Sequence, residues 1–269
     1  MRDKRFIITA VLFILLYLPV FPWLLKEWSA MPDYSHGFLI PLVSIYFLWK
    51  KREELKKTPI SPSAIGFLYV CAGLILYMLA RMGFQFFLQA FSMLIVLFGL
   101  VYAQAGLALA KKTAFSIAYL IFMIPLPQLV YTTITFHLGL LSTKAAFFFV
   151  RLFGIGATRE GNIINLPTCQ LVVAAPCSGI RGLIIYLAAS FAIGYIFQRS
   201  ILKRVVLVLI AVILAFVMNT VRLLATALIA DMLKVTEIPQ AIHDRTGIIT
   251  TIIGFMLLFW INDLLTKKK

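Results

Sequence analysis

A cysteine stands at the start of an apolar segment, within Ala174-Ala175-Pro176-Cys177-Ser178-Gly179-Ile180-Arg181-Gly182. A thiol at a helix start feels the positive end of the helix dipole, and first-turn amides can hold a negative charge. These conditions favour the thiolate, the nucleophilic form. Pro176 suits a first turn, and Gly179 leaves room for a substrate near the backbone. The pattern predicts a nucleophile at Cys177, with the amides near Ser178 and Gly179 as oxyanion donors. The alternative is a half-buried cysteine in a helix cap.

Two polar residues interrupt a later apolar segment, where Asn219 and Arg222 are three positions apart and share one helical face. If that helix enters from the cytoplasm near Val205, a rise of about 1.5 Å per residue places both near its outer end. A charge inside a span is a functional candidate unless its side chain extends to the headgroups. Asn219 is expected to orient Arg222. Arg181, one turn beyond the cysteine, is the competing cation, although its depth favours a structural tie to a carbonyl or acid.

Three histidines are candidates for the base that exchanges a proton with the thiol near neutral pH. His243 precedes the last apolar segment, His36 precedes the second, and His137 falls within a predicted interfacial helix. The sequence leaves His243 and His36 almost equally placed. A solvated loop histidine is the alternative for each, so the hypothesis depends on several such residues meeting at one place.

The composition places the chain among polytopic membrane proteins, since 62% of its 269 residues are hydrophobic and 13% are charged. One soluble core cannot bury so much apolar surface. The formal net charge of +15 does not indicate nucleic acid, because most lysines and arginines stand in short clusters between apolar segments. Three cysteines without an even framework of spacings argue against a disulfide-built secreted fold.

The predicted fold class is an all-α polytopic membrane protein, a single integral domain over residues 1–269 with about eight transmembrane helices. Several apolar segments approach the roughly 20 residues that a span needs. The second is short, at about 13 residues, and must use flanking residues or a thinner bilayer. The predicted spans are 6–25, 37–49, 64–80, 84–110, 114–131, 177–197, 205–230 and 247–265.

The basic clusters predict the orientation. Eight alternating spans place the clusters at 2–5, 50–57, 111–112, 199–204 and 267–269 on one side. By the positive-inside rule that side is cytoplasmic, so both termini are predicted in the cytoplasm. The candidate cysteine, arginine and histidine then gather at the extracytoplasmic face.

Residues 132–176 form the longest insertion on that face. Apolar and basic residues mix from 128 to 153, which favours a helix lying in the membrane interface. Two short β-branched segments, Ile163 to Leu166 and Gln170 to Val173, flank a Pro167-Thr168-Cys169 turn and predict a β-hairpin that leads to the cysteine. The hairpin is either an ordered connector or a support for an extended substrate strand.

Two other classes of protein compete with an enzyme. A transporter or lipid flippase would use intramembrane arginines along a path through the helices. A structural reading pairs Cys169 with Cys177 as a disulfide across the hairpin. The eight-residue spacing of these cysteines is poor for a closed zinc site, and the enzyme reading requires no metal or other cofactor. Cys71, within the third span, is expected to be inert.

In combination these motifs resemble the exosortase/archaeosortase family of membrane-embedded sorting enzymes. The likeness rests on Cys177-Ser178-Gly179, Asn219 with Arg222, and His243. It extends to Tyr34-Ser35-His36-Gly37 with Leu39, Pro41 and Trp49, and to Arg159-Glu160-Gly161-Asn162 with Leu166-Pro167. Many members carry an acidic residue just before the cysteine, where this chain has Ala174, Ala175 and Pro176, so the subfamily and its sorting motif stay open.

The resemblance implies a cysteine endopeptidase and transpeptidase of a prokaryotic plasma (inner) membrane, with Cys177, Arg222 and His243 as its catalytic residues. Its implied partners are exported proteins that end in a short motif, a transmembrane segment and a basic tail, together with the lipid bilayer. In bacteria that signal typically carries Pro-Glu-Pro (the PEP-CTERM type), and exopolysaccharide production often accompanies the system. The acceptor is unknown, and attack by water would give cleavage alone.

Overall fold

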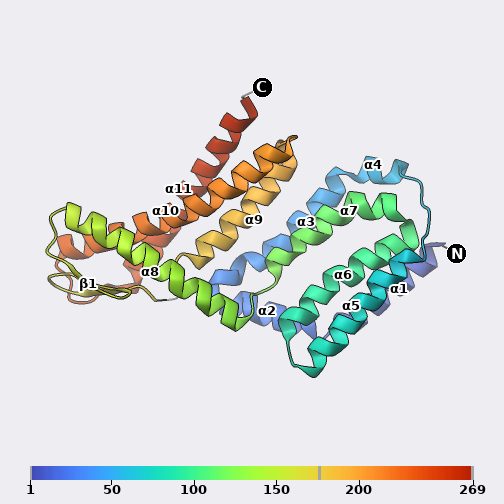
Figure 1. The fold of residues 1–269 in the computed structure, drawn as a ribbon, viewed down its shortest axis with the longest axis horizontal. Coiled ribbons are helices and arrows are strands. Elements are labelled where there is room, and N and C mark those ends of the chain that lie inside the picture. The colour runs from blue at the N-terminus through green and yellow to red at the C-terminus, as the bar shows by residue number, and fades with distance from the viewer. Residues whose placement is uncertain (1, 175–176, 268–269) are drawn as a thin grey trace. The chain divides into compact units, whose positions relative to one another are not determined.

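The structure is a computed structural model that describes residues 2–174 and 177–267, in two compact units that meet in sequence between Pro127 and Gln128 (Figure 1). Met1, Ala175, Pro176, Lys268 and Lys269 lie outside the described residues. The first unit contains α1 (Arg2–Tyr17), α2 (Val20–Ala30), η1 (Pro32–Phe38), α3 (Leu39–Lys50), α4 (Arg52–Lys57), α5 (Ile65–Met82), α6 (Phe86–Ala105), α7 (Leu107–Tyr119) and η2 (Leu120–Met123). The second contains α8 (Gln128–Leu152), β1 (Thr158–Glu160), β2 (Ile163–Asn165), β3 (Gln170–Val172), α9 (Ile180–Phe197), α10 (Ile201–Leu233) and α11 (Gln240–Lys267).

Within the described residues, six helices are long and apolar enough to cross a membrane: α5, α6, α8, α9, α10 and α11. The α1–α2 pair raises the number to seven if it forms one span, bent by 60° at Leu18-Pro19. Proline has no amide hydrogen to continue a helical ladder, which explains a break here. The protein is therefore a mostly helical, multi-pass membrane protein, and the predicted count of eight spans is not confirmed.

The predicted spans 37–49, 84–110 and 114–131 differ most from the structure. α3 has 12 residues, or about 18 Å of helix, which is short of the roughly 30 Å hydrocarbon core. α6 ends at Ala105 because Gly106 has φ +92°, a conformation that interrupts a helix. Lys111 and Lys112 lie inside α7, although their charges predicted a loop, and α7 is only 13 residues long.

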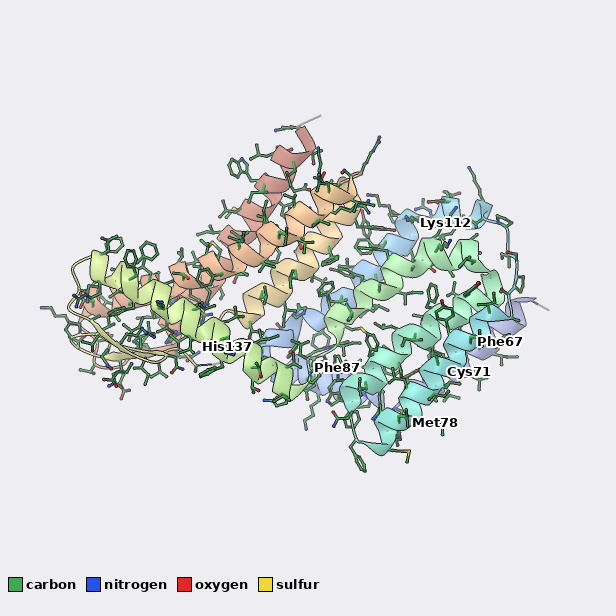
Figure 2. All side chains as sticks on the ribbon, viewed as in Figure 1. Phe67, Cys71, Met78, Phe87, Lys112 and His137 are labelled. Carbon is green, nitrogen blue, oxygen red and sulfur yellow. The ribbon has the colours of Figure 1, made fainter. Side chains whose placement is uncertain are left out.

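α5 and α6 form the closest helix pair of the first unit. Gly66 and Gly99 allow this approach, since a Cβ at Gly66 would overlap the backbone of Ala103 and one at Gly99 would lie 2.7 Å from the amide nitrogen of Val70. The opposite face of α5 is exposed and apolar. Phe67 and Met78 lie there, labelled in Figure 2, and their side chains are 60% and 64% exposed. A face of this kind suits contact with lipid.

The segment η1 is held against η2 by hydrogen bonds to backbone atoms. The indole Nε1 of Trp28 donates to the carbonyl oxygen of Met123 at 2.8 Å, and the amide of Leu126 donates to the Tyr34 hydroxyl at 3.1 Å. His36 Nε2 lies 3.1 Å from the carbonyl oxygen of Phe122, so this nitrogen must carry the hydrogen. The early motif around His36 therefore fixes the chain just before the second unit.

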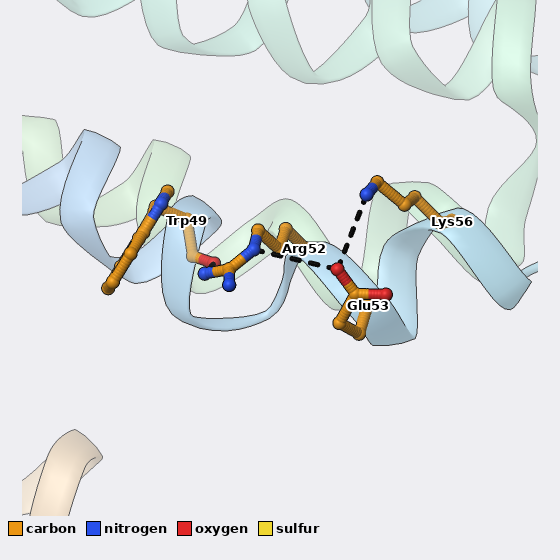
Figure 3. Close-up of polar contacts among 4 residues, drawn as sticks. All are labelled: Trp49, Arg52, Glu53 and Lys56. Carbon is orange, nitrogen blue, oxygen red and sulfur yellow. Dashed lines mark hydrogen bonds and ion pairs between the residues drawn. The ribbon is translucent and has the colours of Figure 1, made fainter.

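The predicted basic cluster at 50–57 covers the end of α3 at Lys50 and the short exposed helix α4 at Arg52–Lys57. The Arg52 Cζ atom lies 4.5 Å from the centre of the Trp49 ring. The Glu53 Oε1 atom lies 3.5 Å from Arg52 Nε and 3.3 Å from Lys56 Nζ, and both ion pairs are drawn in Figure 3. Lys112 extends from α7 to the Glu54 carboxylate at 3.0 Å. Such exposed pairs contribute little stability. Their charges concentrate at one end of the first unit.

In the second unit, α9, α10 and α11 pack along one another, and α8 packs on α10. Tyr186 of α9 joins α11 at Gly254, where any Cβ would overlap its hydroxyl, and that hydroxyl donates to the carbonyls of Thr250 and Thr251. α10 is longer than the predicted span 205–230. α11 begins at Gln240 and not near 247, so His243 lies within the helix and not before it.

The predicted helix over 128–153 is confirmed as α8, and its location in the membrane interface stays a prediction. The predicted hairpin is also confirmed: β2 pairs antiparallel with β3, and the amide of Leu166 donates to the carbonyl of Cys169 at 2.8 Å across the Pro167-Thr168 loop. β1, which the sequence did not predict, adds a third strand in the order β1-β2-β3. The sheet buries Ile164, Leu171 and Val173 against Ala146 and Val150 of α8 and Leu223, Ala227 and Ala230 of α10.

Candidate functional site

Cys177 lies in the short connection between β3 and α9, and it is 9% exposed. Its amide donates to the carbonyl of Ala174 at 2.9 Å. The next turn depends on Gly179, whose φ of +96° belongs to the left-handed region. α9 begins only at Ile180, so the cysteine lies just outside the helix and not in its first turn as predicted. Pro176, predicted at that position, is outside the described residues.

Asn219 of α10 holds this connection in place. Its Nδ2 donates to the carbonyl oxygen of Cys177 at 3.1 Å, and the residue is 6% exposed. A Cβ on Gly179 would lie 2.8 Å from the Asn219 Cγ, so glycine is required here for space as well as for backbone conformation. The contact gives Asn219 a role that sequence reasoning missed: it positions the backbone of the cysteine.

Arg222 follows one turn later on the same face of α10, and its Nη2 donates to the Cys177 Sγ at 3.3 Å. The guanidinium lies against Gly247 of α11, where a Cβ would be 3.5 Å from Nε. The side chain is partly buried. A cation at this distance from a sulfur in a partly desolvated site favours the thiolate over the thiol.

His243 comes from the first turn of α11, and its Nδ1 lies 3.8 Å from the same sulfur. The ring is partly buried, and the adjacent Asp244 accepts a hydrogen bond from Gln240 at 3.0 Å. Three chain segments thus bring a thiol, a guanidinium and an imidazole together within one compact unit. This set can form a thiolate and exchange a proton beside it.

Within the second unit, the candidates Arg181 and His137 do not join this group. Arg181 is exposed on α9, and His137 is exposed on α8 (Figure 2). His36 belongs to the first unit, where it contacts the Phe122 carbonyl. Ser178 is 2% exposed, and its hydroxyl accepts the Ile180 amide at 3.4 Å, so it caps the start of α9.

Cys71, Cys169 and Cys177 form no disulfide with one another, so the structure does not contain the alternative disulfide between Cys169 and Cys177. Cys169 lies in the core beneath the sheet, and burial raises the pKa of its thiol. Among residues 2–174 and 177–267, no three His, Cys, Asp or Glu side chains are grouped as metal ligands would be.

Sequence reasoning also missed residues that pack around the group. Gly139 of α8 passes close to the residue that follows the cysteine, since a Cβ there would lie 3.8 Å from the Ser178 Cβ. Thr226 and Thr246 lie one turn after the arginine and the histidine, and their hydroxyls meet. The sequence did contain a signal for the two threonines. Each stands three or four residues after a predicted site residue, and residues at that spacing share a helical face.

Basic residues gather at the other end of the same helices. Arg204 Nε donates to the carbonyl of Gln198 at 2.9 Å in the turn between α9 and α10, and Lys203 bonds the carbonyl of Leu265 near the end of α11. α9 has 18 residues, or about 27 Å of helix, close to the thickness of a hydrocarbon core. The cationic end and the cysteine are therefore separated by roughly one membrane thickness.

Comparison with known protein families gives a match over most of the chain. A family model described as transmembrane exosortase (Exosortase_EpsH) matches residues 28–260, which covers the early motif, the hairpin, the cysteine, the arginine and the histidine. No curated protein and no solved structure matches the chain.

Proposed function

This chain belongs to the transmembrane exosortase family, and we propose from that membership and its site that it is a cysteine transpeptidase with Cys177 as nucleophile. The observation that carries the proposal is the meeting of Arg222 and His243 at one sulfur, at 3.3 Å and 3.8 Å. Each of the three residues comes from a different segment of the second unit. A cysteine that serves only for packing does not require an arginine and a histidine at its sulfur.

In the proposed reaction, the Cys177 thiolate attacks the scissile carbonyl carbon of a peptide and forms a tetrahedral oxyanion. The carbon–nitrogen bond then breaks, and the His243 imidazolium gives its proton to the departing amine. A thioester to the enzyme remains. An acceptor amine or hydroxyl attacks this thioester, His243 takes its proton, and the thiolate leaves. Water as acceptor gives hydrolysis by the same steps.

Arg222 has two proposed tasks. Before attack it stabilises the thiolate, and during attack its positive charge offsets the developing oxyanion. Backbone amides near Ser178 and Gly179 add donors on the nucleophile's own turn. Asn219 supports both tasks indirectly, because it holds the carbonyl of Cys177 and shares the helical face of Arg222. No step in this scheme uses a metal or another cofactor.

The proposed substrates are exported proteins that end in a short sorting motif, a transmembrane segment and a basic tail. Such a tail places its cleavage site at the membrane surface on the extracytoplasmic side. The separation of the cysteine from the basic end of α9, α10 and α11 supports an extracytoplasmic site, because basic residues favour the cytoplasmic side. We assign the protein to a prokaryotic inner membrane with both termini in the cytoplasm.

The test follows a tail-anchored exported protein encoded in the same genome, in cells that carry wild-type protein or Cys177→Ala, Arg222→Ala or His243→Ala. Wild type should release the substrate from its tail, with a fall in molecular weight and a loss of membrane attachment. Each variant should leave the substrate full-length and anchored while accumulating to the wild-type level. Unchanged processing with Cys177→Ala would reject the mechanism.

A further inference from the structure

Two threonine hydroxyls join the helices that carry the proposed arginine and histidine. Thr226 lies on α10 one turn after Arg222, and Thr246 lies on α11 one turn after His243. Their Oγ1 atoms are 3.1 Å apart, and the two residues are only 0% and 6% exposed. Nothing in the proposed chemistry uses them. Their burial beside the site nevertheless makes the contact sensitive to any shift between α10 and α11.

Each hydroxyl also lies against the backbone of the turn that bears a site residue. Thr226 Oγ1 is 2.9 Å from the carbonyl oxygen of Arg222. Thr246 Oγ1 is 2.8 Å from the carbonyl of Ile242 and 3.1 Å from that of His243. The pair therefore links the two site-bearing turns through four short contacts. A change in the register of one helix would break the central contact first.

Counting hydrogens shows that the link needs both hydroxyls. Each hydroxyl has one hydrogen to donate. Either threonine can donate to the other, and the two hydrogens are then shared between this 3.1 Å contact and the carbonyl oxygens of the two helices. Removal of either hydroxyl breaks the bond between the helices completely.

A neighbouring contact shows what this register controls. Gly247 follows Thr246 directly, and the guanidinium of Arg222 rests against its backbone. One turn further along α11, Thr250 is equally buried, but its hydroxyl bonds carbonyls of its own helix, those of Thr246 and Gly247. The interhelical link thus lies beside the surface that supports Arg222.

We infer that Thr226 and Thr246 are positioning residues for the proposed reaction, because their hydroxyl pair sets the register of α10 against α11. That register fixes the distances from Arg222 and His243 to the Cys177 sulfur. The inference rests on the proposed function for its catalytic consequence. Its structural part, the control of the surroundings of the sulfur, can be measured without a substrate.

The first experiment measures transpeptidation by the purified full-length protein in lipid vesicles. Thr226→Val and Thr246→Val should each lower kcat about tenfold with little change in KM, since a small displacement of reacting groups slows chemistry more than binding. The double variant should lose no more than either single variant, because one shared bond is removed in each case. Thr226→Ser and Thr246→Ser retain the hydroxyl and should restore the rate.

Matched controls make the same chemical change nearby. Thr250→Val on α11 and Thr220→Val on α10 each remove a buried hydroxyl that bonds a carbonyl of its own helix. Both should keep kcat within about twofold of wild type. If the control variants lose as much kcat as Thr226→Val, the effect comes from the loss of any buried hydroxyl. That result would overturn the inference.

The second experiment separates this inference from the proposed function. Alkylation of Cys177 by iodoacetamide, followed by mass spectrometry of its peptide, reports thiolate formation without any substrate. The valine variants should react several-fold more slowly than wild type at pH 7, and at the same rate above about pH 10, where a thiol is ionised without help. The controls should follow wild type throughout.

The outcomes are distinct. If wild type processes no substrate but the valine variants still slow alkylation, the proposed function fails and the positioning role stands. If wild type is active and the valine variants match it in kcat and in alkylation, the positioning role fails alone. Should a valine variant not fold, Thr226→Ala deletes the hydroxyl without adding a methyl group next to Thr246, and the same comparison applies.

Discussion

Two histidines, one in each unit, show how the same side chain takes opposite roles. His36 of the first unit lies 3.1 Å from a backbone carbonyl, where its ring must donate. His243 of the second unit lies 3.8 Å from a sulfur, with a guanidinium bound to the same atom. A backbone carbonyl can only accept a hydrogen bond from the imidazole, whereas a thiol can also give its proton to it. The comparison teaches that the partner, and not the residue type, separates a structural histidine from a candidate base.

The contrast extends to the units that hold these rings. Trp28, Tyr34 and His36 all bond backbone atoms of residues 122–126, so the polar side chains of this part of the first unit shape a loop. In the second unit Asn219 and Arg222 bind the backbone and the sulfur of one cysteine. We therefore expect substitutions in the first group to affect stability and those in the second to affect chemistry.

The largest difference should come from the two cysteines of the second unit. Cys177→Ala removes the proposed nucleophile and should lower transpeptidation by about 10³-fold or more. Cys169→Ala, beneath the sheet, should retain most of the activity with a modest loss of stability. Rates measured with a tail-anchored peptide in vesicles decide between them. Equal losses in both variants would indicate that the proposed nucleophile is wrong.

The two histidines come next. His243→Gln should reduce kcat by about 10²- to 10⁴-fold, the usual contribution of a general acid–base. His36→Gln should leave kcat nearly unchanged and lower the free energy of unfolding by about 1 kcal/mol, the net contribution of one hydrogen bond. Kinetics and thermal unfolding of both variants make the comparison. A large loss of kcat with His36→Gln and none with His243→Gln would identify His36 as the base. The assignment of Cys177 as the nucleophile would then be unchanged.

Arg222 and Arg181 provide the third comparison. Arg222→Met should lower kcat by about 10²- to 10³-fold, as removal of an oxyanion partner does elsewhere. Arg222→Lys keeps the charge without the planar fork and should recover part of this loss. Arg181 is exposed on α9, so Arg181→Met should behave like wild type. A loss with Arg181→Met equal to that with Arg222→Met would contradict the assignment.

Two glycines separate steric overlap from backbone strain. Gly179→Ala combines a φ of +96° with a Cβ 2.8 Å from Asn219 and should cost about 1–3 kcal/mol while slowing the reaction about tenfold. Gly154→Ala has a similar φ of +83° but no atom within 4 Å of the added Cβ. It should show the strain without the loss of activity. Unfolding and kcat of the two variants provide the test.

The smallest effect concerns thiol reactivity in the wild-type protein. Burial raises the pKa of Cys169 above its ordinary value of 9.0, so this thiol should stay mostly protonated at pH 9 and react slowly with iodoacetamide. Cys177, beside Arg222, should react faster at pH 7 to 9. Mass spectrometry of the two peptides over this range provides the measurement. Faster labelling of Cys169 would contradict the proposed environment of the nucleophile.

Local patterns predicted much of the second unit. The apolar lengths indicated α9, α10 and α11, and the β-branched segments indicated β2 and β3, because these signals depend on neighbouring residues alone. The first unit was harder to predict. The charges of Lys111 and Lys112 favoured a loop, but Lys112 reaches Glu54, and the helix breaks instead at Gly106. A contact between distant segments outweighed the local signal there.

The residues of the candidate site were all visible in the sequence, since cysteine, arginine, histidine and asparagine stand out in apolar surroundings. The residue pattern could not choose between His243 and His36, because both were predicted just before a span on the outer side, whereas depth already favoured Arg222 over Arg181. It also could not assign Asn219 to the cysteine backbone or reveal the threonine pair. Those contacts depend on the register of α10 against α9 and α11.

The sequence by itself determined that this chain spans a membrane, that its basic residues cluster outside the apolar segments, and that a cysteine follows a hairpin. Composition and short-range spacing suffice for these conclusions. Only the tertiary structure decided which cation and which imidazole meet that sulfur. The physical reason is that a distance of 3 to 4 Å between three segments depends on how the helices pack, and packing is a property of all the contacting side chains together.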